Sequence, residues 1–269
     1  LWKYNSATNQ WTWVGGGDLV NRIGTIGTKQ TPSANNIPSS RSRSNSWVDA
    51  SGNLWVFGGY GLDVNGSYGY LNNLWKYNIS TNQWTWSNGS EYVNQAGNYG
   101  TKGDPLYDIN IAGARQNSAS WTDANGDYWF FGGQGRDKNG VIGNLNDLWK
   151  YNKTNKEWIW VSGSDIINQN GVYGTMGVAA SANVPGARTN SVTWTDASGN
   201  LWLHGGQGRD RNGSSGYLND LWKYNTSNNT WTWVKGSDLV NPNGVYGTKG
   251  ATSLSNIPGG RFASVSFQD

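Results

Sequence analysis

Four arginines have the chemistry and the spacing of a ligand-binding set, because each occupies the same position of a repeating segment. Each stands six residues before the aromatic residue of a strand-like segment, and they are Arg41, Arg115, Arg188 and Arg261. A guanidinium group presents a rigid fork of N–H donors that fits a carboxylate or a sulfate. Arginines at the start of each innermost strand could therefore bind carboxylates or sulfated sugars. We favour the alternative that each one binds loop carbonyl groups of its own or the next segment.

Tyrosines in long polar loops form the second candidate set. Tyr99, Tyr173 and Tyr246 share the motif Gly-x-Tyr-Gly-Thr. Further tyrosines of these loops are Tyr68, Tyr70, Tyr107 and Tyr217. Exposed rings among Asn, Asp and Ser residues suit sugars, which present an apolar ring face and hydroxyl groups. The alternative, which we favour, is that the motif repeats because it folds the loop onto its neighbouring sheet.

Three Asp-x-Asn-Gly segments place oxygen atoms at alternate positions and are weak candidates for calcium sites. Their aspartates are Asp63, Asp137 and Asp210. Calcium takes about six to eight oxygen ligands, and none of these segments has the length of an EF-hand loop. The same residue types are ordinary in tight turns. We therefore expect no cofactor, with calcium as the alternative.

Residues suited to catalysis are scarce in this chain. The one histidine, His204, stands where the sister segments have Phe57 and Phe131, which indicates an aromatic substitute inside a strand. Nucleophilic catalysis needs a nucleophile, a base and an orienting group together. The only glutamates, Glu91 and Glu157, stand at unrelated positions of the repeat. We therefore expect no enzymatic activity and name no catalytic residue.

A repeat of about 73 residues positions all of these side chains. Leu-Trp-Lys-Tyr segments that contain Trp2, Trp75, Trp149 and Trp222 lie 73, 74 and 73 residues apart. The other tryptophans, of eighteen in total, also fall at fixed positions of the repeat. A rare residue confined to such positions is structural first. We expect all eighteen tryptophans in the core.

Each repeat is expected to form four short antiparallel strands. Residues 115–122 alternate small and large side chains and lead into an Asp-x-x-Gly turn, which is typical of a strand entering a hairpin. The apolar run 127–131 predicts a second strand, which Gly132-Gly133 ends. The segments 148–151 and 158–161 predict the third and fourth strands. The pattern contains no helical periodicity.

The polar stretches between these strands differ in length. The short turns begin at Asp49, Asp123 and Asp196, and they resemble the Asp-box turns of sialidase-type propellers, where the carboxylate caps a hairpin. The stretches 134–147 and 162–187 are expected to form long loops, both on one face of the fold. Long ordered loops on one side of a rigid scaffold are the usual place for recognition.

Several linked features at fixed spacing resemble the kelch repeat of β-propellers. A Gly-Gly pair is followed by an Asn-Asp-Leu-Trp-x-Tyr strand and by a tryptophan seven residues after its tyrosine. The resemblance covers the whole chain and implies an all-β, kelch-type β-propeller of four-stranded antiparallel blades, like the central domain of galactose oxidase or a bacterial secreted kelch-like protein. Galactose oxidase holds copper with a Cys-linked Tyr and two His, a site that a chain with no cysteine and one histidine cannot reproduce.

The resemblance implies one propeller segment, 1–269, with three full blades and two partial ones. The expected ranges are 1–14 for strands three and four of a blade, 41–86, 115–161 and 188–234 for full blades, and 261–269 for a first strand. The second strand of the last blade is missing, which indicates a fragment of a longer propeller. The alternatives are a compact four-bladed ring or half-rings from two chains.

Composition limits the classes of partner. The net charge of +3 and the lack of a basic cluster argue against nucleic acid. No apolar run of about eighteen residues is present to span a membrane. We expect a non-enzymatic extracellular or cell-surface protein that binds a protein or glycan through its long-loop face, or that has a structural role. The alternatives are a carbohydrate-acting enzyme with catalytic groups outside this segment, and an assembly subunit that self-associates through open blade edges.

Overall fold

The computed structural model describes residues 1–105 and 110–266, and in these ranges the chain is built from strands, turns and loops. Eighteen strands form four antiparallel sheets there, and no helix occurs, so none could cross a membrane. The expectation of an all-β, antiparallel fold is confirmed. Tyr107 and the end of the expected strand 261–269, residues 267–269, lie outside the described residues. The chain divides into two compact units, Leu1–Gln95 and Ala96–Asp269.

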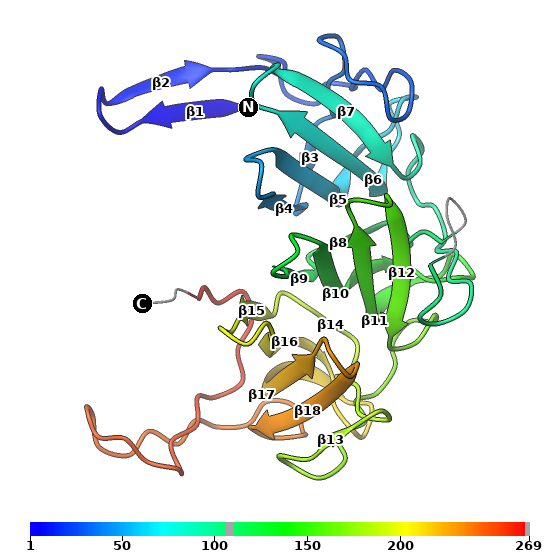
Figure 1. Ribbon diagram of the computed structural model, residues 1–269. Coiled ribbons are helices and arrows are strands. Elements are labelled where there is room, and N and C mark those ends of the chain that lie inside the picture. Colours follow the sequence, from blue (N-terminus) through cyan, green and yellow to red (C-terminus); the bar gives the residue numbers. More distant parts are fainter. Residues whose placement is uncertain (106–109, 267–269) are drawn as a thin grey trace. The chain divides into compact units, whose positions relative to one another are not determined.

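The first unit contains a two-stranded hairpin and a five-stranded sheet. In the hairpin, β1 (Trp2–Asn5) pairs with β2 (Gln10–Trp13). The strands of the larger sheet are β3 (Arg41–Ser42), β4 (Asn45–Val48), β5 (Leu54–Leu62), β6 (Tyr68–Asn78) and β7 (Gln83–Asn88). Their order is β3-β5-β6-β7, and β4 also pairs with β5 (Figure 1).

The second unit contains two sheets of the same design. The first has β8 (Arg115–Gln116), β9 (Ala119–Thr122), β10 (Tyr128–Arg136), β11 (Ile142–Asn152) and β12 (Glu157–Ser162). The second has β13 (Ala179–Ala180), β14 (Arg188–Thr189), β15 (Val192–Thr195), β16 (Leu201–Arg209), β17 (Ser215–Asn225) and β18 (Thr230–Lys235). In both sheets the long central strands, β10 with β11 and β16 with β17, form the hairpin on which the shorter strands pair.

The first strand of each repeat is broken into two short pieces, so the prediction of one continuous strand over 115–122 is wrong. β8 and β9 both pair with β10, but Asn117 between them has a φ of 55° and interrupts the ladder. Arg43 and Asn190 have φ values of 58° and 55° at the same point of their repeats. The left-handed backbone turns the strand locally and separates the arginine end from the aromatic end.

The Gly-Gly pair lies inside the second strand, so the prediction that it ends this strand is also wrong. β10 continues through Gly132 and Gly133 to Arg136, with a register shift between Phe131 and Gly133. Gly133 has a φ of +94°, and a Cβ atom there would lie 2.6 Å from the carbonyl oxygen of Gln116. Glycine is required at this position because the two backbones approach too closely for any side chain.

The polar stretch 134–147 forms the outer half of a hairpin and not the expected long loop. β10 and β11 stay paired as far as Arg136 and Ile142. The turn between them is closed by Asp137, whose Oδ1 accepts the backbone N–H groups of Asn139 and Val141 at 2.9 Å each. Asp and Asn side chains suit a turn as well as a loop, so composition alone could not separate the two. Among the described residues, the long loops are the segments before each first strand.

The carboxylates of the short turns cap their hairpins, as their resemblance to Asp-box turns implies. Oδ1 of Asp123 accepts the backbone N–H groups of Asn125 and Asp127, and its Oδ2 accepts the indole N–H of Trp129 at 2.9 Å. Asp196 makes the same set of hydrogen bonds, including one from Trp202 at 2.8 Å. A tryptophan that follows the turn is thereby held in a fixed orientation by the turn itself.

Aromatic side chains fill the interface between the two sheets of the second unit. The indole N–H of Trp121 donates to the carbonyl oxygen of Trp202 at 2.8 Å. The rings of Phe131 and Trp231 meet edge to face, with centroids 5.5 Å apart. Large flat rings of this kind bury on the order of 150–250 Å² each. The interface confirms that repeated tryptophans build the core of this unit.

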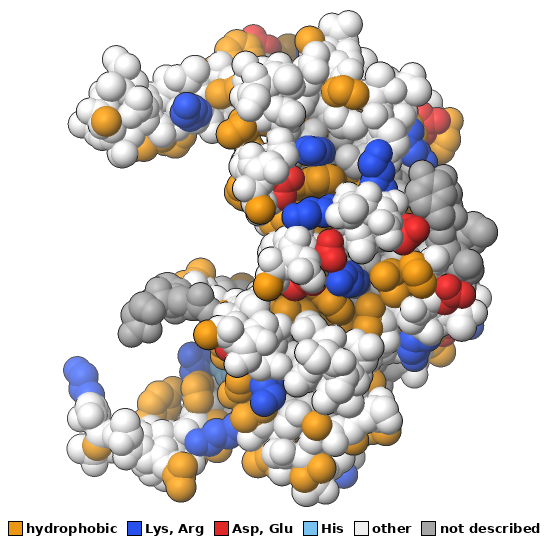
Figure 2. Space-filling view, viewed as in Figure 1, with side chains coloured by type: hydrophobic (Ala, Val, Ile, Leu, Met, Phe, Trp, Pro, Cys, Tyr) orange, Lys and Arg blue, Asp and Glu red, His pale blue; other side chains and the backbone are white. Residues whose placement is uncertain are grey.

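The tryptophans of the β1–β2 hairpin are exposed, so the prediction that all eighteen lie in the core is wrong for three of them. Trp2, Trp11 and Trp13 are 62%, 66% and 50% exposed. Figure 2 shows hydrophobic side chains at the surface of this hairpin. A two-stranded sheet has no first and second strand to enclose these rings, unlike the larger sheets.

The long segment that precedes each sheet folds back onto the fourth strand of that sheet. The backbone N–H groups of Gln30, Gly103 and Gly177 donate to the carbonyl oxygens of Trp86, Trp160 and Trp233, respectively, at 2.7–2.8 Å. In the last sheet this contact extends into β13, which pairs with β18. The outer strand of each of these sheets is therefore covered by the chain that leads into the sheet.

Candidate binding site

Two of the four candidate arginines lie inside the second unit, in buried ion pairs. The guanidinium of Arg115 donates to both carboxylate oxygens of Asp147 at 2.6 Å each. Its remaining donors bind the carbonyl oxygens of Gly113 at 2.9 Å and Gly132 at 3.0 Å. Arg188 binds Asp220 in the same way, with both contacts at 2.7 Å. Both side chains of each pair are almost fully buried.

The tyrosine of the preceding loop completes each cluster. The hydroxyl of Tyr99 donates to Oδ2 of Asp147 at 2.7 Å, and the indole N–H of Trp149 donates to the same oxygen at 2.7 Å. The ring of Tyr99 also lies against the rings of Trp149 and Trp160. In the next repeat Tyr173 and Trp222 make the same contacts with Asp220. We call each such set of Arg, Asp, Tyr and Trp a buried charge cluster.

The titration behaviour of a buried charge cluster follows from its geometry. Burial lowers the pKa of Arg188, but the attraction of Asp220 outweighs it and leaves this pKa above its usual value. Burial raises the pKa of Asp220, and the guanidinium together with the donors Trp222 and Tyr173 reverses this and holds it below its usual value. Burial and the neighbouring carboxylate raise the pKa of Tyr173. The ion pair and the neutral phenol therefore persist across the physiological pH range.

The structure does not bring Arg115, Arg188, Tyr99 and Tyr173 to the surface, so their assignment as ligand-binding candidates is corrected. Tyr99 and Tyr173 are only 4% and 3% exposed. Every side-chain nitrogen of both arginines already donates to a group within the protein. The favoured alternatives are confirmed: the arginines bind backbone carbonyls of their own repeat, and the tyrosines fold the loop onto its sheet. Sequence reasoning missed Asp147 and Asp220, although both stand in the repeated Asn-Asp-Leu-Trp segment.

The remaining candidate arginines and the remaining loop tyrosine have different surroundings. Arg41 is partly buried, and its three nitrogen atoms donate to Ser39, Gly58 and Asn73, none of which supplies a carboxylate. Burial without a carboxylate partner lowers its pKa to about 10. Arg261 is partly buried and its Nε–H donates to the carbonyl oxygen of Gly259 at 3.1 Å. Tyr246 is 75% exposed, in contrast to Tyr99 and Tyr173. Arg41, Arg261 and Tyr246 therefore remain ligand-binding candidates.

The weak calcium candidates use their carboxylates to build turns. Oδ1 of Asp63 accepts the N–H groups of Asn65 and Ser67, and its Oδ2 accepts that of Val93. Asp137 and Asp210 repeat this pattern. Across residues 1–105 and 110–266 no three His, Cys, Asp or Glu side chains come together in a group that could hold a metal ion.

His204 lies in β16, where it pairs with Val192 on one side and Leu221 on the other. Burial lowers its pKa below the usual value, and the positive charges of Arg261 and Arg188 add to this effect, while Asp220 opposes it. The folded protein therefore favours the neutral form of the His204 imidazole. This agrees with the prediction that His204 substitutes for an aromatic residue in a strand.

We expect His204→Phe to remove a loss of stability at mildly acidic pH. The folded protein holds His204 with a lowered pKa, so the unfolded chain binds more protons as the pH falls through about 6.5, and stability decreases there. Denaturant unfolding of the wild type and the variant at pH 8 and pH 5 measures the effect. Between pH 8 and pH 5 the unfolding free energy of the wild type should fall more than that of the variant. An unchanged difference would show that His204 protonates equally well in both states.

Three tyrosines form an exposed row at the outer end of the β5–β6 hairpin. Tyr60 pairs directly with Tyr70, and Tyr68 stands two residues before Tyr70 on the same strand, so all three rings lie on one face of the sheet. Tyr60 stacks on Tyr68 with centroids 6.5 Å apart and meets Tyr70 edge on at 5.5 Å. Tyr60 and Tyr68 are 41% and 51% exposed. We call these three residues the tyrosine row.

The tyrosine row breaks the repeat pattern, which the other aromatic residues largely keep. The two positions of Tyr60 and Tyr68 are occupied by Gln134 and Ile142 in the next repeat and by Gln207 and Ser215 in the last. Ser42, which pairs with Tyr60 across β3 and β5, adds an exposed hydroxyl beside the rings. Comparison of the repeats could have found Tyr60, because its Gly-Tyr-Gly replaces a Gly-Gln-Gly in both sister repeats.

The second unit carries polar and aromatic side chains at the equivalent positions. Gln116 donates from its amide to the side chain of Gln134 at 3.0 Å across β8 and β10. In the last sheet, Tyr217 stacks face to face on Phe262 with centroids 4.9 Å apart and is 41% exposed. Exposed rings beside amide and hydroxyl groups suit ligands that are apolar on one face and polar at the edge.

Comparisons with solved structures include a weak similarity of fold. No family model matches the chain, and no curated protein matches its sequence. Among solved structures the chain is similar to one described as "Structure of YjhT", at 14% sequence identity and a TM-score of 0.47. The match covers 74% of this chain and 53% of that chain, so it spans about half the length of the solved chain.

Proposed function

We propose that this chain is part of a kelch-type β-propeller, of which its sheets are blades, and that it is a non-enzymatic extracellular or cell-surface protein that binds glycans. The observation that carries the binding proposal is the tyrosine row, where two stacked and exposed rings depart from the residues of both sister repeats. The fold does not require these two rings, because the sister repeats have Gln, Ile and Ser at the same positions.

The chemistry of the row favours a sugar over a purely apolar ligand. The C–H face of a pyranose ring packs on an aromatic ring, and its hydroxyl groups need donors and acceptors at the edge. Ser42 lies beside Tyr60, and the phenol groups of the row itself supply further donors and acceptors. The 41–86 range provides the rigid sheet on which these groups are fixed.

The test is a glycan array screened with the intact chain, followed by titration of the best ligand into the double variant Tyr60→Ala/Tyr68→Ala. Stacking on two rings contributes on the order of 1–3 kcal/mol, so we expect the affinity to fall by about tenfold or more. The matched control is Tyr92→Ala, which removes a tyrosine of the same unit that is 45% exposed and lies outside the row. This control should bind as the wild type does.

Two results would contradict glycan binding through the row. One is an array on which no glycan binds, and the other is a double variant whose affinity equals that of the Tyr92→Ala control. The assembly function would then take precedence, because the β1–β2 hairpin exposes three tryptophan rings. Sedimentation velocity at low and high protein concentration measures that self-association directly. The enzymatic alternative gains no support from the described residues.

A further inference from the structure

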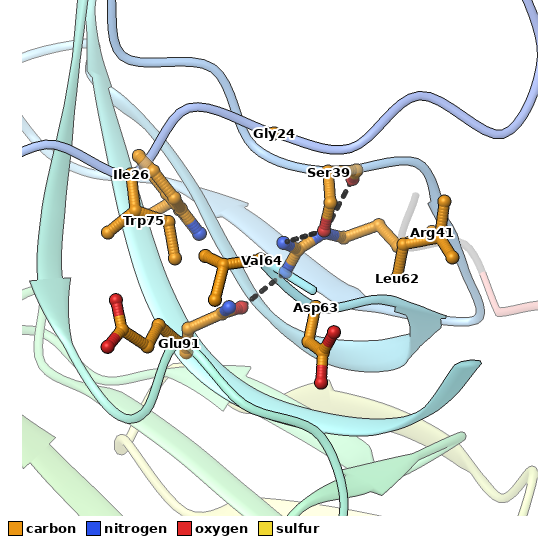
Figure 3. Close-up of a pocket in the computed structure, with 10 residues that line it drawn as sticks. Gly24, Ile26, Ser39, Arg41, Leu62, Asp63, Val64, Trp75 and Glu91 are labelled. Carbon is orange, nitrogen blue, oxygen red and sulfur yellow. Dashed lines mark hydrogen bonds between the residues drawn. The ribbon is translucent and has the colours of Figure 1, made fainter. Parts of the chain in front are cut away.

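The first unit contains an altered copy of the buried charge cluster. Arg41 and Trp75 occupy the positions of Arg115 and Trp149, but Asn73 stands in place of Asp147, and Ile26 stands in place of Tyr99. The cluster has therefore lost its carboxylate and its phenol together, while it has kept the guanidinium and the indole. These four residues line one small cavity (Figure 3).

The substitution of Asn73 removes the carboxylate that would face Arg41 and Trp75. The Arg41 guanidinium still donates to Ser39 and to the carbonyl oxygen of Gly58, so what it lacks is a counter-charge. Oδ1 of Asn73 accepts from Nη1 of Arg41 at 2.6 Å, as Oδ1 of Asp147 does from Arg115. The other atom of the Asn73 amide is then a nitrogen, which can only donate. It takes the position of the carboxylate oxygen that accepts from arginine, tryptophan and tyrosine in the second unit.

The indole of Trp75 shows the consequence of this exchange. Its side chain is fully buried, and its Nε1–H has no hydrogen-bond partner. The equivalent groups of Trp149 and Trp222 donate to Asp147 and Asp220 at 2.7 and 2.8 Å. A buried donor without an acceptor is costly, and such groups in native proteins commonly face a bound water or ion.

The space left by the missing tyrosine ring is small. The cavity between Ile26, Arg41, Asn73 and Trp75 has a volume of about 10 Å³ for the centre of a water-sized sphere. This volume accommodates one particle of about the size of water and excludes a sulfate or a carboxylate ligand. The occupant must therefore be a single water molecule or a single small ion.

We infer that this cavity binds one monoatomic anion of the size of chloride, held by the guanidinium of Arg41, the indole N–H of Trp75 and the amide of Asn73. An anion accepts from all three donors at once and supplies the negative charge that Asp147 supplies in the second unit. A water molecule accepts from at most two of them and supplies no negative charge.

Two carboxylates that line the same cavity set the affinity of this anion site. Asp63 uses both oxygens to accept backbone N–H groups of its turn, so it is fixed in place. The Glu91 carboxylate points away from the Arg41 guanidinium in Figure 3. The equivalent of Glu91 in the next repeat, Asp165, pairs with Lys138, but here Val64 replaces the lysine. Glu91 forms a hydrogen bond with Tyr92 but no ion pair with any described residue, so its negative charge weakens anion binding.

Bromide is the probe for a direct test, because it scatters anomalously and can be told from water. Crystals of the wild-type chain grown with sodium bromide should show an anomalous peak in contact with Arg41 and Trp75. Asn73→Asp recreates the Arg115–Asp147 arrangement, so it should fold and lose the peak. Ile26→Tyr fills the cavity and should also lose it. A wild-type cavity that contains only water under these conditions would overturn the inference.

Equilibrium unfolding in solution gives a second measure that does not depend on crystals. At constant ionic strength, with bromide replacing the larger methanesulfonate, the unfolding constant of the wild type should fall about tenfold for each tenfold rise of bromide above its dissociation constant. Asn73→Asp should remove this dependence, and Glu91→Gln should shift it to lower bromide concentration. If the unfolding constants of the wild type and of Asn73→Asp depended equally on bromide, an anion site at this position would be refuted.

Discussion

Asp147→Asn is expected to lower the unfolding free energy of the second unit by about 3–5 kcal/mol, because it leaves a buried guanidinium without its counter-charge. Asp147 accepts hydrogen bonds from Arg115, Tyr99 and Trp149. An amide at this position has only one oxygen atom that can accept. The ring of Tyr99 fills the space that is empty in the first unit, so an anion cannot replace the lost charge. Denaturant unfolding monitored by hydrogen exchange in residues 110–266 measures the loss.

The matched control for this prediction is Asp165→Asn, which removes one partner of an exposed ion pair in the same unit. The side chains of Lys138 and Asp165 are 46% and 26% exposed. Exposed pairs contribute about 0–1 kcal/mol, so the control should differ little from the wild type. Equal losses in the two variants would mean that the charge on Asp147 has no special role in the fold.

Trp149→Ala is expected to cost about 3–5 kcal/mol, since it removes a fully buried ring and opens a cavity in the core. Trp149 packs against Tyr99 and Trp158, and its indole N–H binds Asp147. The expected result is a lower midpoint in guanidinium chloride, with the change confined to the transition of the second unit.

Trp2→Ala is the control for the same position of the repeat. Trp2 is 62% exposed in the β1–β2 hairpin, so its loss removes little buried area and should change stability by less than about 1 kcal/mol. Two tryptophans with the same sequence context would then differ severalfold in effect. A large loss in Trp2→Ala would show that the hairpin is enclosed in solution.

The sequence predicted the all-β fold well because turn chemistry is local. Asp123 caps its turn through backbone groups two and four residues away, so the signal lies within a few positions. The role of Gly133 could not be predicted in this way. Glycine is required there by the carbonyl oxygen of Gln116, which belongs to another strand, whereas the Gly-Gly pattern by itself indicates the end of a strand.

The loop tyrosines show why the candidate site was predicted only in part. Tyr173 and Tyr246 stand in the same five-residue motif, Gly-Val-Tyr-Gly-Thr, yet one is 3% exposed and the other 75%. Tyr173 is enclosed because its hydroxyl binds Asp220, which lies 47 residues later in the chain, so the information is not local. Local composition therefore could not show that Tyr99 and Tyr173 are core residues, whereas comparison of the repeats would have singled out Tyr60 and Asn73.

The cover over each outer strand has a consequence for the order of synthesis. The segments that contain Gly103 and Gly177 precede β12 and β18 in the chain, and they pair with these strands in the folded state. During translation each cover leaves the ribosome before the strand that it protects. A newly made outer strand thus meets its own cover first, which limits pairing between neighbouring nascent chains on one messenger RNA.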